Sequence, residues 1–170
     1  MHRAEGRSTE PKKEVQLKAE EHTQGVGAIV TNLQALETVL RYFLLRRHKQ
    51  EVQFPRIGDQ EANKTYLTRW IALDELIKNY NRALDETEKE FKVDREVVRI
   101  RDAFAHGRLL TSTEIPARLW KFGQSKKGRV KVEFCEELTA EWLKSTWLMI
   151  DRERQKVVDC FKARGYQGLR

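Results

Sequence analysis

Residues that break helices or build disulfide frameworks are scarce in this sequence. It has nine glycines and three prolines among 170 residues, while 35% of its residues are charged. This composition disfavours an all-β fold and favours long, solvated helices. The two cysteines, Cys135 and Cys160, match no metal-binding or redox spacing, so a reducing compartment is the simplest location.

Long apolar runs are also missing. The opening segment, "MHRAEGRSTEPKKE", contains no apolar core of a signal peptide. The most apolar region carries Glu37 and Arg41 in its middle, which disfavours a membrane span. We therefore expect a cytoplasmic protein that does not engage a membrane.

Positive charge, in contrast, is in excess, with a formal net charge of +7. Residues 101–170 alone contain 15 basic and 9 acidic residues. This asymmetry is compatible with a polyanionic partner such as RNA. The alternative is a basic surface without such a partner, which many soluble proteins have.

Hydrophobic periodicity predicts most of the chain to be helical. Apolar residues recur every three or four positions in four segments, at about 14–49, 66–84, 95–106 and 139–164. Residues 1–13 are polar and aperiodic, which predicts a disordered tail followed by one domain over 14–170. The predicted fold is all-α, an antiparallel helical bundle of four main helices with a small β-hairpin inserted before the last helix.

The predicted hairpin joins "RLWKF" to "RVKVEFC" through "GQSKKG". Alternation places five apolar side chains on one face: Trp120, Phe122, Val130, Val132 and Phe134. The other face and the loop hold the candidate RNA-binding residues Lys121, Lys126, Lys127 and Arg129, with Lys131. These cations could contact an RNA backbone while Trp120 stacks on a base, or the tip is only solvated and Trp120 belongs to the core. The remaining tryptophans are expected in the core: Trp70, Trp142 and Trp147.

The helix predicted over 95–106 has an unusual end, "RDAFAHG". Asp94 fits an N-cap, and Gly107 fits the left-handed position that ends a helix. On a helical wheel Arg101 lies about 40° from Val97, inside the apolar sector. Burying an unpaired guanidinium lowers the stability of the fold by about several kcal/mol or more, because the ion loses its hydration. Arg101 therefore needs an anion, a carboxylate from another helix, or a wet cleft between subunits.

Asp102 and His106 are four residues apart, so their side chains can meet on one helix face. The carboxylate would then orient the imidazole, which could donate and accept protons. Arg101 and such a histidine suffice for RNA cleavage by the 2′-OH, although a histidine at a helix end is also a common cap. Arg101 and His106 lie about 140° apart on the wheel, so a long arginine, an altered last turn or a twofold dimer must bring them together.

The stretch "RDAFAHG", late in a small helical protein, resembles the R-x(4–6)-H signature of the HEPN superfamily. Two other pairs match the bare spacing, Arg41 with His48 and Arg99 with His106. The polar residue after Arg101, the small apolar residues and the final glycine favour the pair Arg101 and His106.

The resemblance implies a homodimeric, metal-independent endoribonuclease in which two motifs face each other across the symmetry axis. Arg101 would bind the scissile phosphate, Asp102 would orient His106, and His106 would be the acid or base. Such proteins often act as toxins or in phage defence, with an antitoxin or regulatory protein as partner. In the toxin branch of the superfamily whose members are modified by their antitoxin, a tyrosine usually lies two residues after the histidine. This chain has Arg108 at that position. The alternative is a non-catalytic HEPN-like module that binds a nucleotide or a protein.

Other chemistries find no support in the sequence. No glutamate lies three residues before any of the four histidines, and no zinc spacing, Walker loop or G-x-S-x-G elbow occurs. We expect neither a metal ion nor a cofactor.

Overall fold

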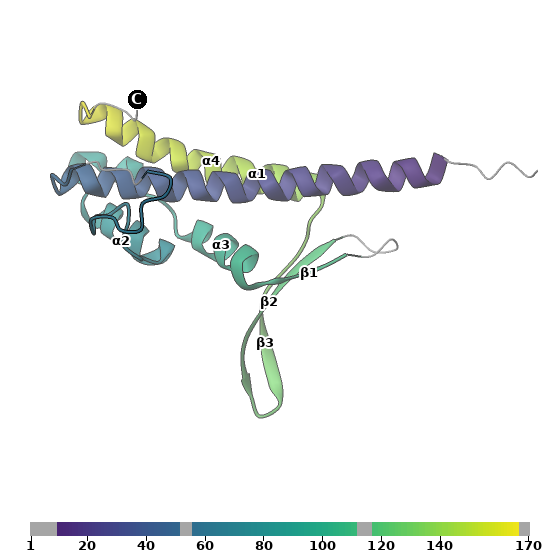
Figure 1. The fold of residues 1–170 in the computed structure, drawn as a ribbon. Coiled ribbons are helices and arrows are strands. Elements are labelled where there is room, and N and C mark those ends of the chain that lie inside the picture. The colour runs from purple at the N-terminus through teal and green to yellow at the C-terminus, as the bar shows by residue number, and fades with distance from the viewer. Residues whose placement is uncertain (1–9, 52–55, 112–116, 167–170) are drawn as a thin grey trace, which may run out of the picture.

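The computed structural model describes residues 10–51, 56–111 and 117–166, with the side chains of the first helix from residue 20 onward. Over these residues the chain forms α1 (Glu10–Arg47), α2 (Leu73–Arg82), the 3-10 helix η1 (Glu86–Phe91), α3 (Glu96–His106), β1 (Arg108–Leu110), β2 (Arg118–Lys126), β3 (Arg129–Glu137) and α4 (Ala140–Ala163) (Figure 1). Of the predicted tail over 1–13, residues 1–9 lie outside the described residues. Residues 10–13 belong to the first turn of α1.

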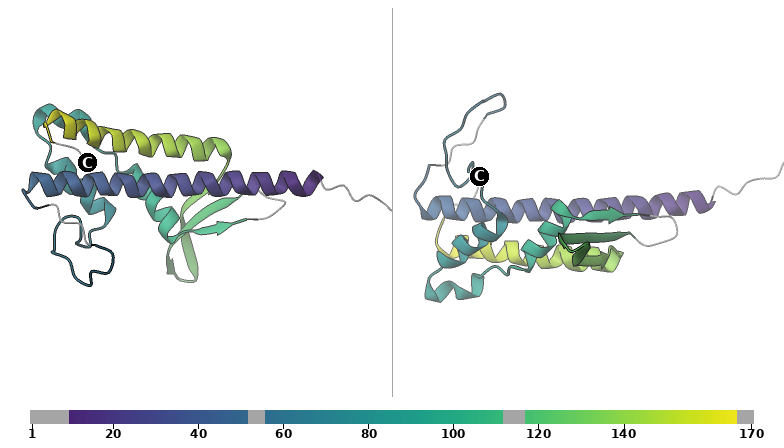
Figure 2. Two further views of the ribbon diagram at one scale, coloured as in Figure 1. Left: turned by 45° about the horizontal axis from the view of Figure 1, so that its top comes forward. Right: turned by 90° about the horizontal axis from the view of Figure 1, so that it is seen from below.

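The two longest helices, α1 and α4, lie side by side and run in the same direction (Figures 1 and 2). The side-chain amide of Asn32 donates to the carbonyl oxygen of Trp147 at 3.2 Å. Ten residues further along α1, the ring of Tyr42 stacks on Phe161 at 5.4 Å between centroids. Contacts thus advance together along both helices, and the prediction of an antiparallel bundle is wrong for this pair.

The buried stripe of α1 agrees with its predicted periodicity. The spacing of three and four residues in this segment connects six apolar residues from Val26 to Phe43. Val26 is half-buried, and the other five are buried: Ile29, Leu33, Leu36, Leu40 and Phe43. The start of α4 is also as predicted, since the hydroxyl of Thr139 accepts a hydrogen bond from the Trp142 backbone N–H at 3.1 Å. Local signals were sufficient for these two helices.

The helix predicted over 66–84 begins only at Leu73. The guanidinium of Arg41, on α1, donates to the carbonyl oxygens of Tyr66, Arg69 and Ile71 at 2.9–3.1 Å. Those carbonyls would otherwise accept helical N–H groups, so Arg41 holds the segment before α2 in a loop. The apolar spacing of this segment was therefore misleading.

The prediction of an all-α fold is wrong, because the described residues contain a three-stranded antiparallel sheet in the order β1-β2-β3. The predicted hairpin is longer than expected, and its strands are joined by the two residues Lys127 and Gly128, which both have positive φ. The unpredicted strand β1 pairs with the base of β2, with Arg108 opposite Trp120. The fold is mixed, and Figure 1 shows the β2–β3 hairpin extending away from the helices.

The register also overturns the expected hairpin face. Leu119 and Phe134 are each 3% exposed and form the side of the sheet that packs on the helices. Trp120 lies opposite Cys135 and Phe122 opposite Val132, on the other side. A register shift between Lys121 and Phe122 separates Phe134 from the residues expected beside it, because a bulge changes the alternation.

The tryptophans are more exposed than predicted. Trp70, in the loop held by Arg41, is 95% exposed, and Trp147 is 37% exposed. Trp142 is half-buried and packs near Phe134, with 6.3 Å between ring centroids. Trp70 was expected in the core because of its helical spacing, but the segment that contains Trp70 is a loop and not a helix.

Candidate functional site

The motif lies on α3, whose start is fixed to α4. The carboxylate of Glu153, a residue only 5% exposed, accepts a hydrogen bond from the backbone N–H of Asp94 at 2.8 Å. The side chain of Asp94 in turn accepts from the N–H of Glu96 at 2.9 Å, close to its predicted capping role. Val97, Ile100 and Ala103 form the buried side of the helix. The orientation of α3, and so of the motif, is therefore set by packing and by a buried acid.

Arg101 lies at the edge of this buried side and not within it. Its side chain is 31% exposed, while Val98 is half-buried and Ala105 is exposed. The apolar sector of the wheel is thus only partly covered, and Arg101 lies at its exposed edge. Its guanidinium donates to the Asp102 carboxylate at 3.1 Å, the one hydrogen bond it forms among the described residues. Since a guanidinium has five N–H donors, Arg101 retains donors for an anion.

Asp102 and His106 are not joined in the described structure. The carboxylate of Asp102 accepts from Arg101, and its other oxygen lies 3.7 Å from the ammonium nitrogen of Lys121. His106 is exposed on the last turn of α3. The expected pairing at four-residue spacing is therefore replaced by contacts of Asp102 with two cations.

The last turn of α3 is a regular helix. The backbone N–H of Gly107 donates to the carbonyl oxygen of Ala103 at 2.7 Å, the ordinary four-residue bond. The helix neither tightens nor opens before His106. Arg101 and His106 of one chain therefore keep the divergence of about 140° that an α-helix imposes on this spacing.

Gly107 is required for a different reason from the one predicted. Its φ is −79° and its ψ 177°, which is extended backbone and not left-handed. A Cβ at this position would lie 2.2 Å from the carbonyl oxygen of Ala103 and 2.9 Å from that of Trp120. Glycine thus lets the chain pass from α3 into β1 against the backbone of β2, which fixes where His106 lies.

The other two matches to the motif spacing have visible structural roles. Arg41 holds the loop before α2, and His48 stacks on Tyr66 at 5.0 Å between centroids. Arg99 pairs with Glu96 at 3.2 Å and lies over the ring of Phe134. Arg99, whose side chain is 54% exposed, forms ion pairs with Glu96 and Glu136, whereas the ion pair of Arg101 among the described residues is with its own neighbour Asp102.

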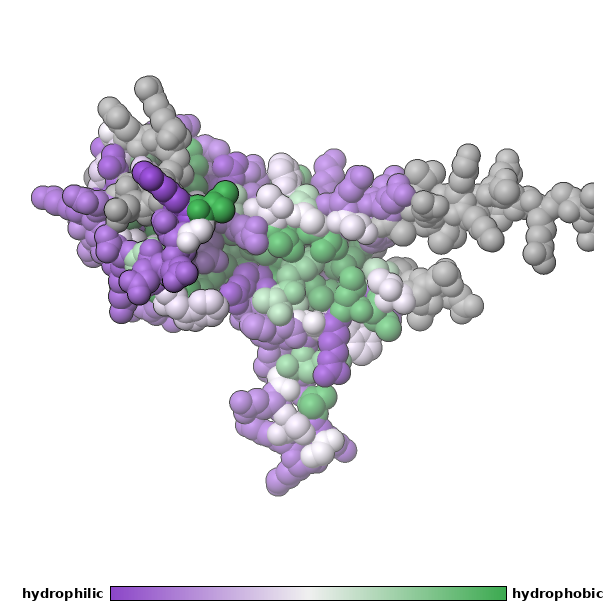
Figure 3. Space-filling view, in the orientation of Figure 1, coloured by the Kyte–Doolittle hydropathy of each residue, from purple (hydrophilic) through white to green (hydrophobic). Residues whose placement is uncertain are grey.

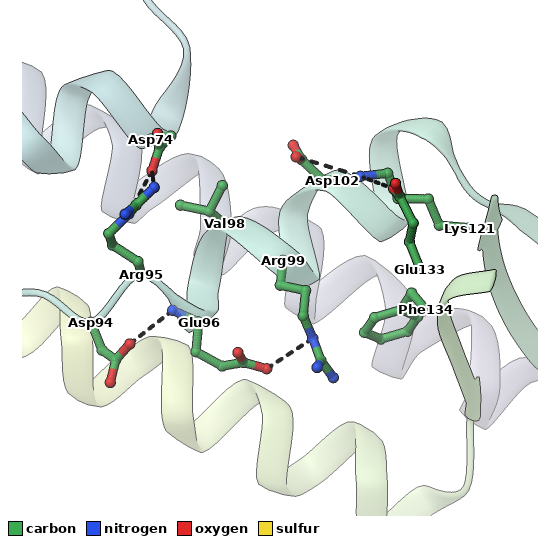
Figure 4. A pocket seen from close by; sticks show the side chains of 10 residues that line it. All are labelled: Asp74, Asp94, Arg95, Glu96, Val98, Arg99, Asp102, Lys121, Glu133 and Phe134. Atoms are coloured by element: carbon green, nitrogen blue, oxygen red, sulfur yellow. Dashed lines mark hydrogen bonds and ion pairs between the residues drawn. The ribbon is translucent and has the colours of Figure 1, made fainter. Parts of the chain in front are cut away.

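An open groove of about 680 Å³ runs beside the motif on the other flank of α3 (Figure 4). It contains five acidic and three basic side chains: Asp74, Asp94, Glu96, Asp102, Glu133, Arg95, Arg99 and Lys121. Hydrogen bonds from Lys78 and Arg95 lower the pKa of Asp74, so this acid stays ionised. Arg101 and His106 do not line the groove. Because acids prevail in it, the groove is unsuited to an RNA backbone.

The four candidate RNA-binding residues of the hairpin have two different settings. Lys121 is turned toward α3, where it lies 3.7 Å from Asp102 and 3.2 Å from Glu133. Lys126, Lys127 and Arg129 are exposed at the tip. Alternation alone could not separate them, because it does not tell which side of the sheet packs on the helices.

Comparison with known proteins gives no relative for this chain. No family model, no curated protein and no solved structure matches it. Within the described ranges, no helix has the length and hydropathy of a bilayer span. No group of three or more His, Cys, Asp or Glu side chains in the same ranges is placed to hold a metal ion.

Proposed function

We propose that this protein is a HEPN-type endoribonuclease that works as a homodimer and needs neither metal ion nor cofactor. The observation that carries the proposal is the state of the motif: Arg101 keeps unused donors on an accessible edge of α3, and the helix ends at the exposed His106. These are the cation and the proton-transfer group that the reaction requires.

In the proposed reaction the 2′-OH of RNA attacks the adjacent phosphorus. A new O–P bond forms while the bond to the 5′-oxygen of the next nucleotide breaks, giving a 2′,3′-cyclic phosphate and a 5′-hydroxyl. His106 accepts the 2′-OH proton, and the resulting imidazolium returns a proton to the leaving 5′-oxygen. Arg101 stabilises the charge on the phosphate, and Asp102 is a positioning residue that holds the guanidinium.

A second copy of the chain is part of the proposal because one copy cannot align the two groups. Arg101 and His106 diverge on a regular helix, so we propose that each site takes one of them from each chain. The face between α1 and β1 supports association, since apolar side chains gather there (Figure 3). Among the described side chains, Val30 of α1 and Leu109 of β1 are large, apolar and exposed, while Leu110 lies on the opposite side of β1.

The association can be tested by light scattering of purified protein. Wild type is expected to have the mass of a dimer. Leu109→Asp should shift it toward monomer, since Leu109 is 53% exposed on β1. Ile57→Asp is the matched control, because Ile57 is fully exposed in a loop and should leave the mass unchanged. A monomeric wild type at tens of micromolar would contradict the dimer.

Cleavage is tested with mixed RNA in the presence of a chelator, followed by analysis of the RNA ends. Wild type should leave cyclic phosphates, while Arg101→Ala and His106→Ala should each be slower by about 100-fold or more. Arg99→Ala removes the alternative arginine and should stay within a few-fold of wild type. Equal cleavage by wild type and His106→Ala would assign the activity to a contaminant. A folded dimer without cleavage would favour a non-catalytic module that binds a nucleotide or protein.

The biological setting belongs to the proposal as well. We propose a cytoplasmic toxin or phage-defence effector, held in check by an antitoxin or another regulatory protein. Arg108 replaces the tyrosine that antitoxin modification uses in one branch, so control by a bound protein is favoured over that modification.

A further inference from the structure

The β2–β3 hairpin has its charge divided between base and tip. Every acidic side chain of the base forms an ion pair with a neighbouring cation: Glu133 with Lys121, Glu136 with Arg99 and Glu137 with Arg118. The distal stretch, residues 122–132, contains no acid and four exposed cations: Lys126, Lys127, Arg129 and Lys131. In the described part of the chain none of these four forms an ion pair, so the tip carries a net charge of +4 that is free to bind an anion.

Aromatic side chains lie between this tip and the motif, on the side of the sheet that faces away from the helices. Trp120 and Phe122 are half-buried and meet edge to face, with 5.8 Å between ring centroids. The guanidinium of Arg108 lies 5.7 Å from the centre of the Phe122 ring. Two aromatic faces and a planar cation therefore share one surface.

The chain connects this surface directly to His106. Arg108 is the second residue after His106, and it pairs with Trp120 across β1 and β2. Paired residues have Cα atoms about 5 Å apart. From Trp120 to Lys126 the strand extends about 20 Å at about 3.3 Å per residue. A single element thus runs from the motif, past the aromatic pair, to the basic tip.

We propose that this surface, the Arg108–Trp120–Phe122 face with the four tip cations, is a binding track for single-stranded RNA. The cations alone would suit any polyanion. The aromatic faces select an unpaired strand, because a duplex keeps its bases stacked within the helix. One part of the inference rests on the proposed ribonuclease function: the bound strand is delivered to His106, beside which the track ends.

Binding is measured by fluorescence anisotropy on the His106→Ala protein, so that RNA stays intact. The probes are a labelled 20-nucleotide single strand of mixed sequence and the duplex of the same sequence. The tip variant carries Lys126→Gln, Lys127→Asn, Arg129→Gln and Lys131→Gln. Asparagine before Gly128 preserves the positive-φ turn. The control, Lys144→Gln with Arg152→Gln, removes two exposed cations of α4.

The two halves of the track should fail in different ways. The tip variant should bind the single strand at least about 10-fold more weakly, and its salt slope should fall by up to about 2.8, at about 0.7 per phosphate contact. Phe122→Leu should lower single-strand affinity by about 5-fold or more with an unchanged salt slope, since it removes stacking and no charge. The control variant should bind as tightly as its parent.

Three results would overturn the inference. These are equal affinity of the parent for duplex and single strand, a tip variant that binds normally, and a Phe122→Leu protein that keeps its affinity but loses dimer mass. The last result would assign the face to contact between copies. Loss of single-strand binding in the tip and Phe122 variants supports the track even where wild type does not cleave, so the two proposals fail separately.

Discussion

Replacing Gly107 by alanine tests why the motif ends in glycine. The new Cβ would lie 2.2 Å from the Ala103 carbonyl oxygen and 2.9 Å from that of Trp120. Both atoms are backbone, so the end of α3 must move away from β2. Overpacking of this kind lowers stability by about 1–3 kcal/mol, and the contact with two backbone oxygens favours the upper end. For a chain of this length, 3 kcal/mol corresponds to a fall of about 6–12 °C in melting temperature.

Thermal unfolding followed by circular dichroism measures the effect, with two comparison variants. Gly27→Ala has no atom within 4 Å of its Cβ and should stabilise α1 by about 0.5–1 kcal/mol. Gly107→Asn distinguishes a requirement for left-handed backbone from a requirement for a residue without Cβ. Asparagine adopts the left-handed conformation readily, but its Cβ would meet the same two carbonyl oxygens. A Gly107→Asn protein as stable as wild type would refute the close-approach reasoning.

The other predictions concern the contacts that hold the helices. Arg41→Ala removes a largely buried guanidinium and leaves the three carbonyl oxygens that it contacts without this donor. The substitution should therefore lower the free energy of unfolding by about 2–3 kcal/mol and make the loop before α2 sensitive to protease. Unchanged stability and unchanged proteolysis would contradict the role of Arg41. The hydrogen bond from Arg164 lowers the pKa of Glu88, so this carboxylate stabilises the fold above its unfolded pKa, and the contribution is lost as the pH falls through the folded value. Urea unfolding should therefore find Glu88→Gln less stable than wild type by about 1–3 kcal/mol at pH 7, with the difference shrinking toward pH 3; a difference independent of pH would argue against the ion pair.

Helices whose limits are set locally were predictable from the sequence. The hydroxyl of Thr139 caps α4 by accepting a hydrogen bond from the N–H of Trp142, three residues later, and Gly165 follows the helix with a φ of +65°. The buried stripe of α1 also needed only its period. These features depend on residues within one or two turns, which a sequence displays directly.

Features set by distant residues were not predictable. The start of α2 is fixed by Arg41, which lies 28 residues before Arg69. β1 is three residues long and has no alternation long enough to recognise. The parallel direction of α1 and α4 follows from how the connecting segments are laid out, which no periodicity records.

The candidate site was partly predictable for the same reason. The wheel gave the angle between Arg101 and His106, and the regular α3 keeps it. The wheel could not show how much of the apolar sector is covered by other elements, so it did not give the exposure of Arg101. Nor could it show that Lys121 contacts Asp102, because strand alternation does not tell which side of the sheet packs on the helices.

The central claim is that each site combines Arg101 of one chain with His106 of the other. Mixing inactive Arg101→Ala and inactive His106→Ala proteins, with exchange of subunits, tests it most directly. Half of the dimers would then be mixed, and each mixed dimer would hold one intact site of two. The account predicts that RNA cleavage returns to about a quarter of the wild-type rate. Dimers that exchange subunits but stay inactive would contradict a site shared between two chains.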